Sequence, residues 1–383
     1  MSLQRARVAI VGGGLSGLTA AWLLAQQGID DVVLLESRSG LGGRILSVDA
    51  QGAAVDATVP AIDRFDLGPT WFWPALQPQF DHFVAELGLA RFPQFDEGDV
   101  LVERTPHQAP LRVQGYPSAP ALMRWQGGTG ALIAALHQRL DPASLRTGHS
   151  VCSVRRAGAH VDVEVEKAEG GRATWRVDQV LLALPPRLAA HRISFEPPLP
   201  PELLHRWRQT PTWMAPHAKY VAIYEAPFWR EQGLSGSARS AVGPMTEIHD
   251  VSMPGGHAAL FGFLGVPAQV RSQVSEADLR AHCRAQLGRL WGARAAAPVA
   301  DALKDWAADP MTATDDDQHP LSHHVEAPPP SPEAGPWQGC LTGIGSEWSR
   351  EFSGYLAGGV DAATEGVRAM LATGHARVTI LGT

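Results

Sequence analysis

Three glycines and one glutamate near the start of the chain have the spacing of a dinucleotide-binding turn. Gly12, Gly14 and Gly17 lie at the positions of a GxGxxG motif, and Glu36 follows downstream. In such a motif the first glycine permits a tight turn, the second lets a pyrophosphate approach the backbone, and the third lets helix and strand pack closely. A carboxylate at the place of Glu36 accepts hydrogen bonds from ribose hydroxyls and disfavours a 2′-phosphate. These residues predict a site for NAD or FAD rather than NADP.

The elements that position these residues can be predicted from the flanking sequence. Residues 7–11 form a short apolar, β-branched run typical of a buried parallel strand, and residues 32–35 form a second one. Residues 15–27 are rich in alanine and leucine and predict a helix that Gly28 ends. The order strand, turn, helix, strand and acid makes a purely structural glycine turn the poorer explanation. Two residues at the helix start and one beside Glu36 join the predicted cofactor contacts: Leu15, Ser16 and Ser37.

Composition limits the class of protein and its partners. A chain of 383 residues predicts two to three domains. The net charge of −7, without a basic run, argues against nucleic acid and acidic membranes as partners. The three cysteines are far apart, which excludes a disulfide framework and fits a reducing cytoplasm. Residues 8–25 carry no charge, but their glycines suit a turn better than a signal peptide or membrane helix. We therefore predict a cytoplasmic protein without a membrane segment.

Two further motifs separate FAD from NAD. Gly42, Gly43 and Arg44 follow the second strand, and Asp66-Leu-Gly-Pro-Thr-Trp71 comes later. With the N-terminal fingerprint, this sequence resembles the flavin-containing amine oxidases, the family of monoamine and polyamine oxidases. The two glycines expose backbone N–H groups, and the guanidinium of Arg44 can donate two parallel hydrogen bonds. Together they suit a second set of contacts to the FAD phosphates. The resemblance implies further FAD contacts at Gly68, Pro69, Thr70 and Trp71.

The resemblance extends over nearly the whole chain. Residues 79–89 and 131–140 predict helices, the second one after a glycine-rich segment. Four short apolar or alternating runs, at residues 151–154, 161–165, 173–177 and 180–184, predict a strand meander. By the resemblance, the backbone of Val151 would contact the adenine.

Lys219 is the first residue for which the resemblance implies a role in catalysis. It lies ten residues before Trp229, in a segment similar to the family's strand followed by Pro-Phe-Trp. In the family a lysine at this spacing holds a water against flavin N5, where a cation would stabilise reduced flavin and oxygen as it accepts electrons. The alternative is a strand lysine whose ammonium reaches solvent.

The C-terminal segment provides the second set of matches. Gly345 and Glu347 take the places of glycine and glutamate in the family's Ala-Gly-x-Glu motif. Gly354, Tyr355 and Leu356 resemble its Gly-Tyr-x-x-Gly motif, which opens a helix. The resemblance implies that this helix N-terminus aims at the flavin pyrimidine, and that Tyr355 is one wall of an amine-binding cage. An ordinary amphipathic tyrosine is the alternative.

The sequence departs from the family in three ways. Residues 90–126 are rich in proline and lack the helical periodicity of the family's substrate lid, so the pocket is either open or covered by another subunit, as in a homodimer. Trp306 is a predicted FAD contact, and the segment after it, residues 309–315, contains neither the cysteine nor the tyrosine of monoamine oxidases. This predicts noncovalent FAD and a missing second cage tyrosine. Trp73 and Trp348 are candidates for pocket walls instead. Residues 315–317 (three aspartates), with His319, His323 and His324, allow a metal cluster or an acidic patch, but the nearby prolines favour a solvated loop without metal.

Together these features predict an α/β fold, with a Rossmann-like FAD-binding domain and an interleaved α+β substrate domain. The FAD domain is expected at residues 1–66, 126–187 and 336–383, and the substrate domain at 67–125 and 188–335. The substrate domain should hold a mixed sheet around residues 219–224 and 258–265, with a helix at 275–290 capped by Ser275.

The predicted function is FAD-dependent oxidation of a small amine, by hydride transfer to flavin N5 and reoxidation by O2 to H2O2. Two alternatives stay open. One is a renalase-like or desaturase-like oxidoreductase of a non-amine substrate such as a dihydronicotinamide. The other is a flavin-binding protein without catalysis.

Overall fold

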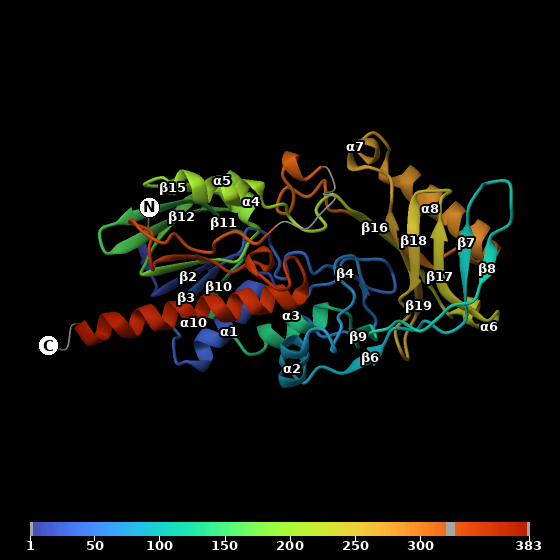
Figure 1. Ribbon diagram of the computed structural model, residues 1–383, viewed down its shortest axis with the longest axis horizontal. Coiled ribbons are helices and arrows are strands. Elements are labelled where there is room, and N and C mark those ends of the chain that lie inside the picture. The colour runs from blue at the N-terminus through green and yellow to red at the C-terminus, as the bar shows by residue number, and fades with distance from the viewer. Residues whose placement is uncertain (1–2, 319–325, 381–383) are drawn as a thin grey trace. The chain divides into compact units, whose positions relative to one another are not determined.

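The computed structural model describes residues 3–318 and 326–380. The chain divides into two compact units, each assembled from separate segments of the sequence (Figure 1). Unit 1 contains Met1–Arg44, Ile133–Trp213 and Leu321–Thr383, and unit 2 contains Ile45–Leu132 and Met214–Pro320. The segments of the two units alternate along the chain.

A parallel sheet of five strands forms the centre of unit 1. In spatial order its strands are β10 (Leu145–Arg146), β3 (Val32–Leu35), β2 (Val8–Val11), β14 (Gln179–Leu182) and β21 (Leu341–Gly343). Helix α1 (Leu15–Gln26) connects β2 to β3, and Gly28 follows it with a φ of 70°. This arrangement confirms the predicted Rossmann-like order of strand, glycine turn, helix and strand.

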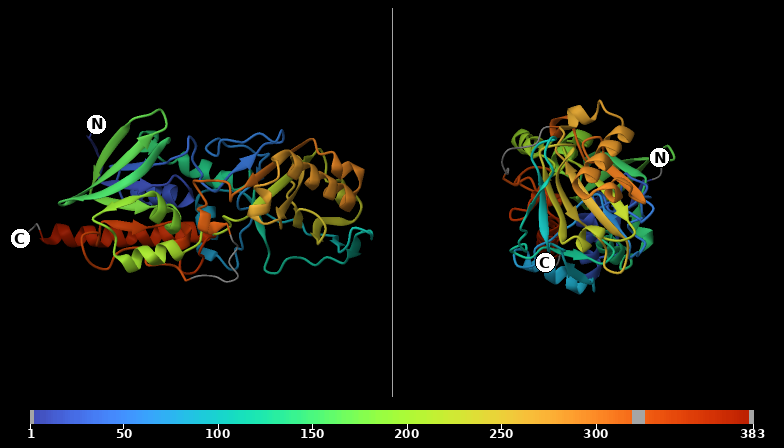
Figure 2. Two further views of the ribbon diagram at one scale, coloured as in Figure 1. Left: turned by 90° about the horizontal axis from the view of Figure 1, so that it is seen from above. Right: turned by 90° about the vertical axis from the view of Figure 1, so that its right-hand side faces the viewer.

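The first and last helices of unit 1 lie side by side. Helix α10 (Leu356–Ile380) runs beside α1 in both projections (Figure 1 and Figure 2). A Cβ added at Gly359 would lie 3.0 Å from the Ser16 Oγ. Glycine at this position therefore lets α10 approach the start of α1 closely.

A second sheet of unit 1 contains the predicted meander. Its strands, in spatial order, are β1 (Leu3–Arg5), β13 (Arg172–Val177), β12 (His160–Lys167), β11 (His149–Ala157) and β15 (Ser194–Glu196). Strands β11, β12 and β13 are antiparallel neighbours, as predicted. The prediction that the fourth run continues the meander is wrong, because β14 pairs in parallel with β2 and β21. The side chains of Val180, Leu181 and Leu182 are all fully buried, which is typical of a central parallel strand covered on both faces.

A mixed sheet of seven strands forms the centre of unit 2. In spatial order its strands are β20 (Ala300–Asp305), β16 (Ala218–Tyr224), β19 (Ala258–Leu264), β18 (Met245–Asp250), β17 (Leu234–Ser240), β7 (Asp99–Glu103) and β8 (Leu111–Val113). Only β17 and β7 are parallel among these neighbours, so the predicted mixed sheet is confirmed.

Both faces of this large sheet are partly covered. Helix α8 (Glu276–Trp291) packs on one face (Figure 2). Its N-cap Ser275 Oγ accepts a hydrogen bond from the Asp278 N–H, as predicted. The short strands β4 (Ser47–Val48) and β5 (Phe65–Asp66) pack on the other face. There Phe65 contributes to a core with Val221 and Phe261.

The smaller elements complete the two units. Residues 90–126, all of them described, contain no helix, as predicted; they form β6 (Arg91–Pro93), β7, β8 and β9 (Met123–Trp125). The predicted helices at 79–89 and 131–140 occur as α2 (Pro78–Glu86) and α3 (Gly130–His137). The remaining helices are α4 (Pro186–Arg192), α5 (Pro201–Gln209), α6 (Phe228–Glu231), α7 (Ala268–Arg271) and α9 (Ala293–Ala296), with 3₁₀ turns at Pro142–Ser144, Asp315–Asp317 and Ser346–Trp348.

The compact units and the predicted functional domains have different boundaries. Two segments predicted in the FAD domain belong to unit 2, namely residues 45–66 and 126–132. Two segments predicted in the substrate domain belong to unit 1, namely residues 188–213 and 321–335. Packing explains the first of these differences, because Val48 and Phe65 are buried in a core of unit 2. Which residues bind cofactor or substrate is a separate question, and the functional domains stay a prediction. Within the part of the chain that the structure describes, no helix has the length and apolar character needed to cross a membrane.

Candidate functional site

The glycine turn of unit 1 leaves the N-terminus of α1 open. Gly12 has a φ of 110°, and a Cβ there would lie 2.5 Å from the Ala183 carbonyl oxygen. A Cβ at Gly17 would lie 2.0 Å from the Gly12 oxygen, so the helix could not pack against the strand. Gly14 is the N-cap, and no side chain among the described residues caps the helix there. The N–H groups of the first turn, which includes Leu15 and Ser16, are therefore placed to bind a phosphate.

Glu36 is held rigidly at the end of β3. Its carboxylate accepts hydrogen bonds from the Gly13 N–H at 2.6 Å, the Arg38 N–H at 2.7 Å and the Ser37 hydroxyl at 3.3 Å. The residue is only 5% exposed. A carboxylate has about four acceptor positions, so these three donors leave capacity for a ribose hydroxyl.

Arg44 and Glu347 join two distant segments at this turn. The Arg44 Nη1 lies 2.5 Å from the Glu347 Oε1 and its Nη2 lies 3.0 Å from the Oε2, which is a bidentate pair. The Arg44 Nη2 also donates to the Ser346 Oγ at 3.1 Å. Burial alone would raise the pKa of Glu347, but the charge and hydrogen bonds of Arg44 outweigh it and hold that pKa below its ordinary value.

The segment before Arg44 lies directly on the glycine turn. The Gly42 N–H donates to the Gly13 oxygen at 2.9 Å, and Gly14 and Gly42 form a β-bridge. Gly43 has a φ of 58°, a conformation that favours glycine. Gly345, by contrast, precedes the 3₁₀ turn that contains Glu347, and a Cβ there would lie 2.8 Å from the Leu184 oxygen. The structure thus brings together the glycine turn, the Gly-Gly-Arg segment and Glu347, as expected of one binding site.

Tyr355 stands immediately before α10 and has an aromatic neighbour that the sequence did not reveal. Its ring centroid lies 5.8 Å from that of Trp213, with an interplanar angle of 32°. The two residues are 36% and 37% exposed. Gly354 has a φ of 82°, and a Cβ there would lie 2.3 Å from the Trp213 Cβ. Leu356 begins the helix, as the motif predicted.

Trp213 also contacts the buried Arg44–Glu347 ion pair, because its backbone N–H donates a hydrogen bond to the Glu347 Oε1 at 3.3 Å. No spacing rule links Trp213 to Tyr355, because they come from different segments and meet only through tertiary packing. Sequence reasoning therefore missed it, and the only available signal was an aromatic residue in the Pro-Thr-Trp segment before β16.

Lys219 lies in unit 2 on β16, and its side chain does not reach solvent. It is 2% exposed, and its Nζ donates to the Gly68 oxygen at 3.0 Å and to the Thr70 Oγ1. The Nζ also lies 3.9 Å from the ring centroid of Phe261. Burial lowers the pKa of Lys219 to about 7, although the nearby Asp66 carboxylate acts to raise it. A buried lysine with two hydrogen-bond acceptors and a lowered pKa is unlike an ordinary strand lysine whose ammonium reaches solvent.

The predicted Asp-x-Gly turn positions the partners of Lys219. Asp66 accepts hydrogen bonds from the Thr129 N–H and hydroxyl and from the Ser47 hydroxyl at 2.9 Å. The Pro69 oxygen accepts from the same threonine hydroxyl at 3.2 Å. Burial raises the pKa of Asp66, which the nearby Lys219 charge partly offsets. The turn is therefore fixed by buried hydrogen bonds on both sides.

Three tryptophans predicted to belong to the site have different surroundings. Trp306 is buried in unit 2 and its Nε1 donates to the Leu67 oxygen at 3.0 Å. Trp73 is half-buried in the same unit. The interpretation of Trp348 as a pocket wall is wrong, because it is 4% exposed and packs edge-on against Trp207 in the core of unit 1. Gly343 makes room for its indole, which spacing from Tyr355 could not indicate.

Two other predictions concern less specific positions. Val151 is a buried residue of β11 directly before an irregularity in the strand pairing, and its contact with adenine stays a prediction. The solvated-loop interpretation of residues 315–317 needs correction at Asp317, which is buried and accepts hydrogen bonds from the Thr314 N–H and hydroxyl. The three histidines predicted beside it, at 319, 323 and 324, lie outside the described residues. Within residues 3–318 and 326–380, no group of three histidine, cysteine or acidic side chains could hold a metal ion.

Comparison with known proteins identifies the family. The family described as flavin containing amine oxidoreductase matches residues 112–371, and an NAD(P)-binding Rossmann-like domain matches residues 10–87. The chain belongs to the flavin-containing amine oxidoreductase family. This confirms the family membership that the sequence motifs predicted.

Individual relatives of this amine oxidoreductase agree with the assignment. A putrescine oxidase of Kocuria rosea is 38% identical over 113 residues, a match that covers 27% of this chain and 23% of that enzyme. A probable flavin-containing monoamine oxidase A of Dictyostelium discoideum is 23% identical, over 78% of this chain and 83% of the relative. A solved putrescine oxidase, a triple mutant with redesigned cofactor binding, has the same fold with a TM-score of 0.77; it is 20% identical, over 97% of this chain and all of the other.

The amine oxidoreductase is an FAD-dependent enzyme, and its unit 1 fits that cofactor. The uncapped N-terminus of α1, the glycines that a Cβ would obstruct and the buried Glu36 carboxylate all suit a dinucleotide with an unmodified ribose.

Proposed function

We propose that this amine oxidoreductase oxidises the carbon–nitrogen bond of a small amine, using noncovalently bound FAD. The observation that carries the proposal is Lys219, a buried lysine with two hydrogen-bond acceptors and a pKa of about 7 at the position of the family lysine. The names of the relatives, a putrescine oxidase and a monoamine oxidase, support an amine substrate. When bound, the flavin supplies the acceptor for a hydride from the substrate α-carbon, and O2 then removes the electrons as H2O2.

The residues of unit 1 would hold the cofactor in this proposal. The first turn of α1 binds the pyrophosphate, and Glu36 binds the ribose hydroxyls. Arg44 is fixed by Glu347, so its remaining N–H groups can approach a phosphate without a search through side-chain conformations. The three cysteines are Cys152, Cys283 and Cys340, and none of them lies in the segment directly after Trp306, residues 307–315, which supports noncovalent attachment.

Lys219 would hold and move a proton. With a pKa near 7, its Nζ exists in both protonation states at neutral pH, and it accepts or donates a proton with little driving force in either direction. In its charged form it favours negative charge that develops on the reduced cofactor or on oxygen.

Tyr355 and Trp213 would form one aromatic wall rather than two walls with a gap. A methylene or amine group needs about 3.5 Å to each ring, so rings that sandwich it lie about 7 Å apart. The observed 5.8 Å between centroids leaves no such gap. A substrate would therefore lie across the exposed faces of the pair, and Trp213 replaces the missing second tyrosine only in part.

The test is direct. Purified protein should show an oxidised flavin spectrum, acid precipitation should release all of the flavin into solution, and anaerobic addition of a suitable amine should bleach the spectrum. Bleaching by NADH but by no amine would overturn the amine assignment. The cytoplasmic location and a homodimer stay predictions, which fractionation and light scattering would examine.

A further inference from the structure

One face of the unit 2 sheet places an acidic and a basic side chain in line with Lys219. Lys219 on β16 is directly opposite Phe263 on β19, and Phe263 is directly opposite Glu247 on β18. His249, two residues further along β18, is opposite Phe261. Residues that are directly opposite in a sheet project from the same face, so these side chains share one surface.

Glu247 and His249 form a partly exposed pair that nothing in the proposed reaction uses. The His249 Nε2 lies 2.8 Å from the Glu247 Oε1, and the two side chains are 21% and 34% exposed. The hydrogen bond from His249 is the main cause that lowers the pKa of Glu247, so this carboxyl stays ionised at neutral pH. If the Nε2 donates to Glu247, the Nδ1 is an acceptor, and it makes no hydrogen bond within the part of the chain that the structure describes.

The other charged groups on this face leave room for a cation. Arg239, which is opposite Glu247 on β17, approaches its Oε1 only to 3.4 Å and has a side chain that is 70% exposed. An exposed pair of this kind contributes little and is readily exchanged. Lys219 lies two strands away, with Lys304 beyond it on β20, so neither touches the pair.

Apolar rings fill the space between Lys219 and the pair. Phe261 lies below the Lys219 Nζ at 3.9 Å, and its ring centroid is 5.5 Å from that of His249. Phe263 is half-buried between Lys219 and Glu247. Trp71 packs edge-on against His249 with the centroids 4.9 Å apart. Two strand spacings, about 9.5 Å in all, separate the Lys219 and Glu247 backbones.

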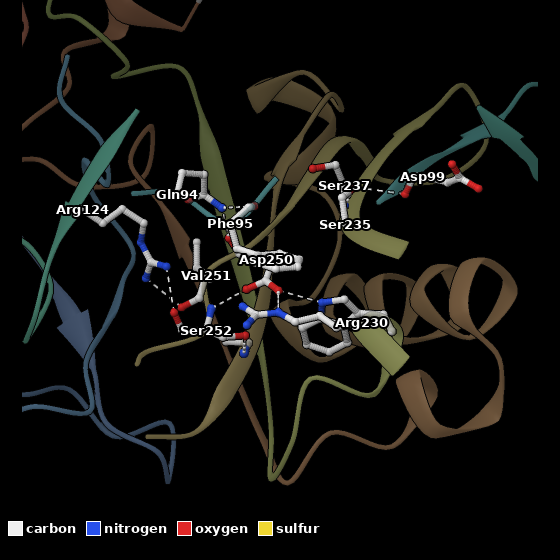
Figure 3. Close-up of polar contacts among 12 residues, drawn as sticks. Gln94, Phe95, Asp99, Arg124, Arg230, Ser235, Ser237, Asp250, Val251 and Ser252 are labelled. Carbon is white, nitrogen blue, oxygen red and sulfur yellow. Dashed lines mark hydrogen bonds and ion pairs between the residues drawn. The ribbon is translucent and has the colours of Figure 1, made fainter. Parts of the chain in front are cut away.

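A buried polar network fixes this wall (Figure 3). Gln94 accepts a hydrogen bond from the Trp71 Nε1 at 2.8 Å. It also donates to the Asp250 backbone oxygen at 2.6 Å. The Asp250 carboxylate accepts from the Arg230 Nε at 2.8 Å and from the Trp229 Nε1 at 2.7 Å. The end of β18, next to His249, is thus held by partners on several segments, and the pair is preorganised.

We propose that Glu247 and His249 bind a second basic group at the far end of the amine substrate, so that the enzyme prefers α,ω-diamines to monoamines. The proposal rests on the proposed function and takes the reacting amine to lie near Lys219. The ammonium group donates to the Glu247 carboxylate and the His249 Nδ1, displacing Arg239, while the methylenes cross the half-buried ring of Phe263. A chain of about four to six methylenes matches a separation of two strands.

The test compares matched substrates on the holoenzyme. Anaerobic flavin reduction is measured with 1,6-diaminohexane and hexylamine, and with 1,4-diaminobutane and butylamine. The limiting rate of reduction divided by the Kd of the amine is compared within each pair. We expect Glu247→Gln to lower the diamine-to-monoamine ratio at least about tenfold, the size of a lost charge-assisted hydrogen bond. His249→Asn should lower it less. Glu231→Gln, at an exposed carboxylate on α6, is the control and should leave the ratio unchanged.

A binding measurement separates recognition from folding and chemistry. The diamine 2,5-dimethyl-2,5-hexanediamine has no α-hydrogen and cannot be oxidised, so its Kd can be measured by calorimetry on oxidised holoenzyme. That Kd should rise about tenfold in Glu247→Gln, while the flavin spectrum and Tm stay those of the wild type. A wild-type enzyme without diamine preference, or equal ratios in wild type and Glu247→Gln, would overturn the inference and leave amine oxidation intact. If no amine reduces the flavin, the proposed function itself fails.

Discussion

Replacing Lys219 by methionine should change the stability of the protein in a way that depends on pH. In the folded protein burial lowers the pKa of Lys219 from 10.5 to about 7. The unfolded chain therefore binds more protons than the folded one between these two values, and stability rises with pH across that window. At about 1.36 kcal/mol for each pKa unit, the charged lysine destabilises the fold by about 5 kcal/mol below pH 7, and by nothing above pH 10.5.

The methionine variant removes this penalty but leaves two buried acceptors without their donor. Loss of the hydrogen bonds to the Gly68 oxygen and the Thr70 Oγ1 costs about 1–3 kcal/mol in all. Lys219→Met should therefore be about 2–4 kcal/mol more stable than wild type at pH 6, and about 0–2 kcal/mol less stable near pH 10, where part of the charge penalty remains. The sign of the difference should change between about pH 7 and pH 10.

Urea unfolding with saturating FAD, followed by tryptophan fluorescence across this pH range, measures the difference. Thr70→Val is the matched control, since it removes one hydrogen-bond partner but keeps the titrating lysine. A difference between Lys219→Met and wild type that stays constant with pH would refute the reasoning, because it would mean that Lys219 titrates alike in the folded and unfolded chain.

Four further outcomes are expected. Lys219→Met should slow reoxidation of reduced flavin by O2 at least about tenfold and slow reduction by amine less, as stopped-flow absorbance would show; equal effects on both half-reactions would remove its role with oxygen. Tyr355→Ala should lower the rate of flavin reduction by amine while the visible spectrum still shows bound FAD, and loss of the flavin would contradict this. Arg44→Met should weaken FAD binding and destabilise the protein by about 3–5 kcal/mol, because it leaves the buried Glu347 carboxylate without its partner; Glu347→Gln in the same background should restore part of the Tm. Trp348→Leu should lower the Tm and leave KM for the amine unchanged, and a raised KM would return Trp348 to the substrate pocket.

Local patterns predicted the parts of the fold whose partners are close in sequence. The β2–α1–β3 unit follows from two β-branched runs, a helix of alanine and leucine and the glycines between them. The same patterns failed at β14, since an apolar run shows that a strand is buried but not which sheet it joins. Ser275 and Gly28 were predictable because a helix end is specified by neighbouring residues.

The site was predicted residue by residue, but not as a set of contacts. Arg44 and Glu347 were both expected near FAD, yet their pairing depends on tertiary structure that no spacing encodes. Trp213 was missed and Trp348 was misplaced for the same reason: both are tryptophans near glycines, and only packing decides which one is exposed. The position of Glu247 and His249 on the same sheet face as Lys219 could not be predicted from the sequence, because it depends on the strand register.

The pairing of Arg44 with Glu347, and of α1 with α10, has a consequence for synthesis of the chain. Ribosomes make the glycine turn before Glu347 and α10, so a nascent chain has the first part of its nucleotide-binding turn long before it has the carboxylate that fixes Arg44. Stable binding of the cofactor is then expected only after synthesis has passed Glu347 and α10. A chain that stalls or is cut before Glu347 would present an unpaired arginine and an uncovered α1, which is the kind of surface that chaperones and proteases recognise.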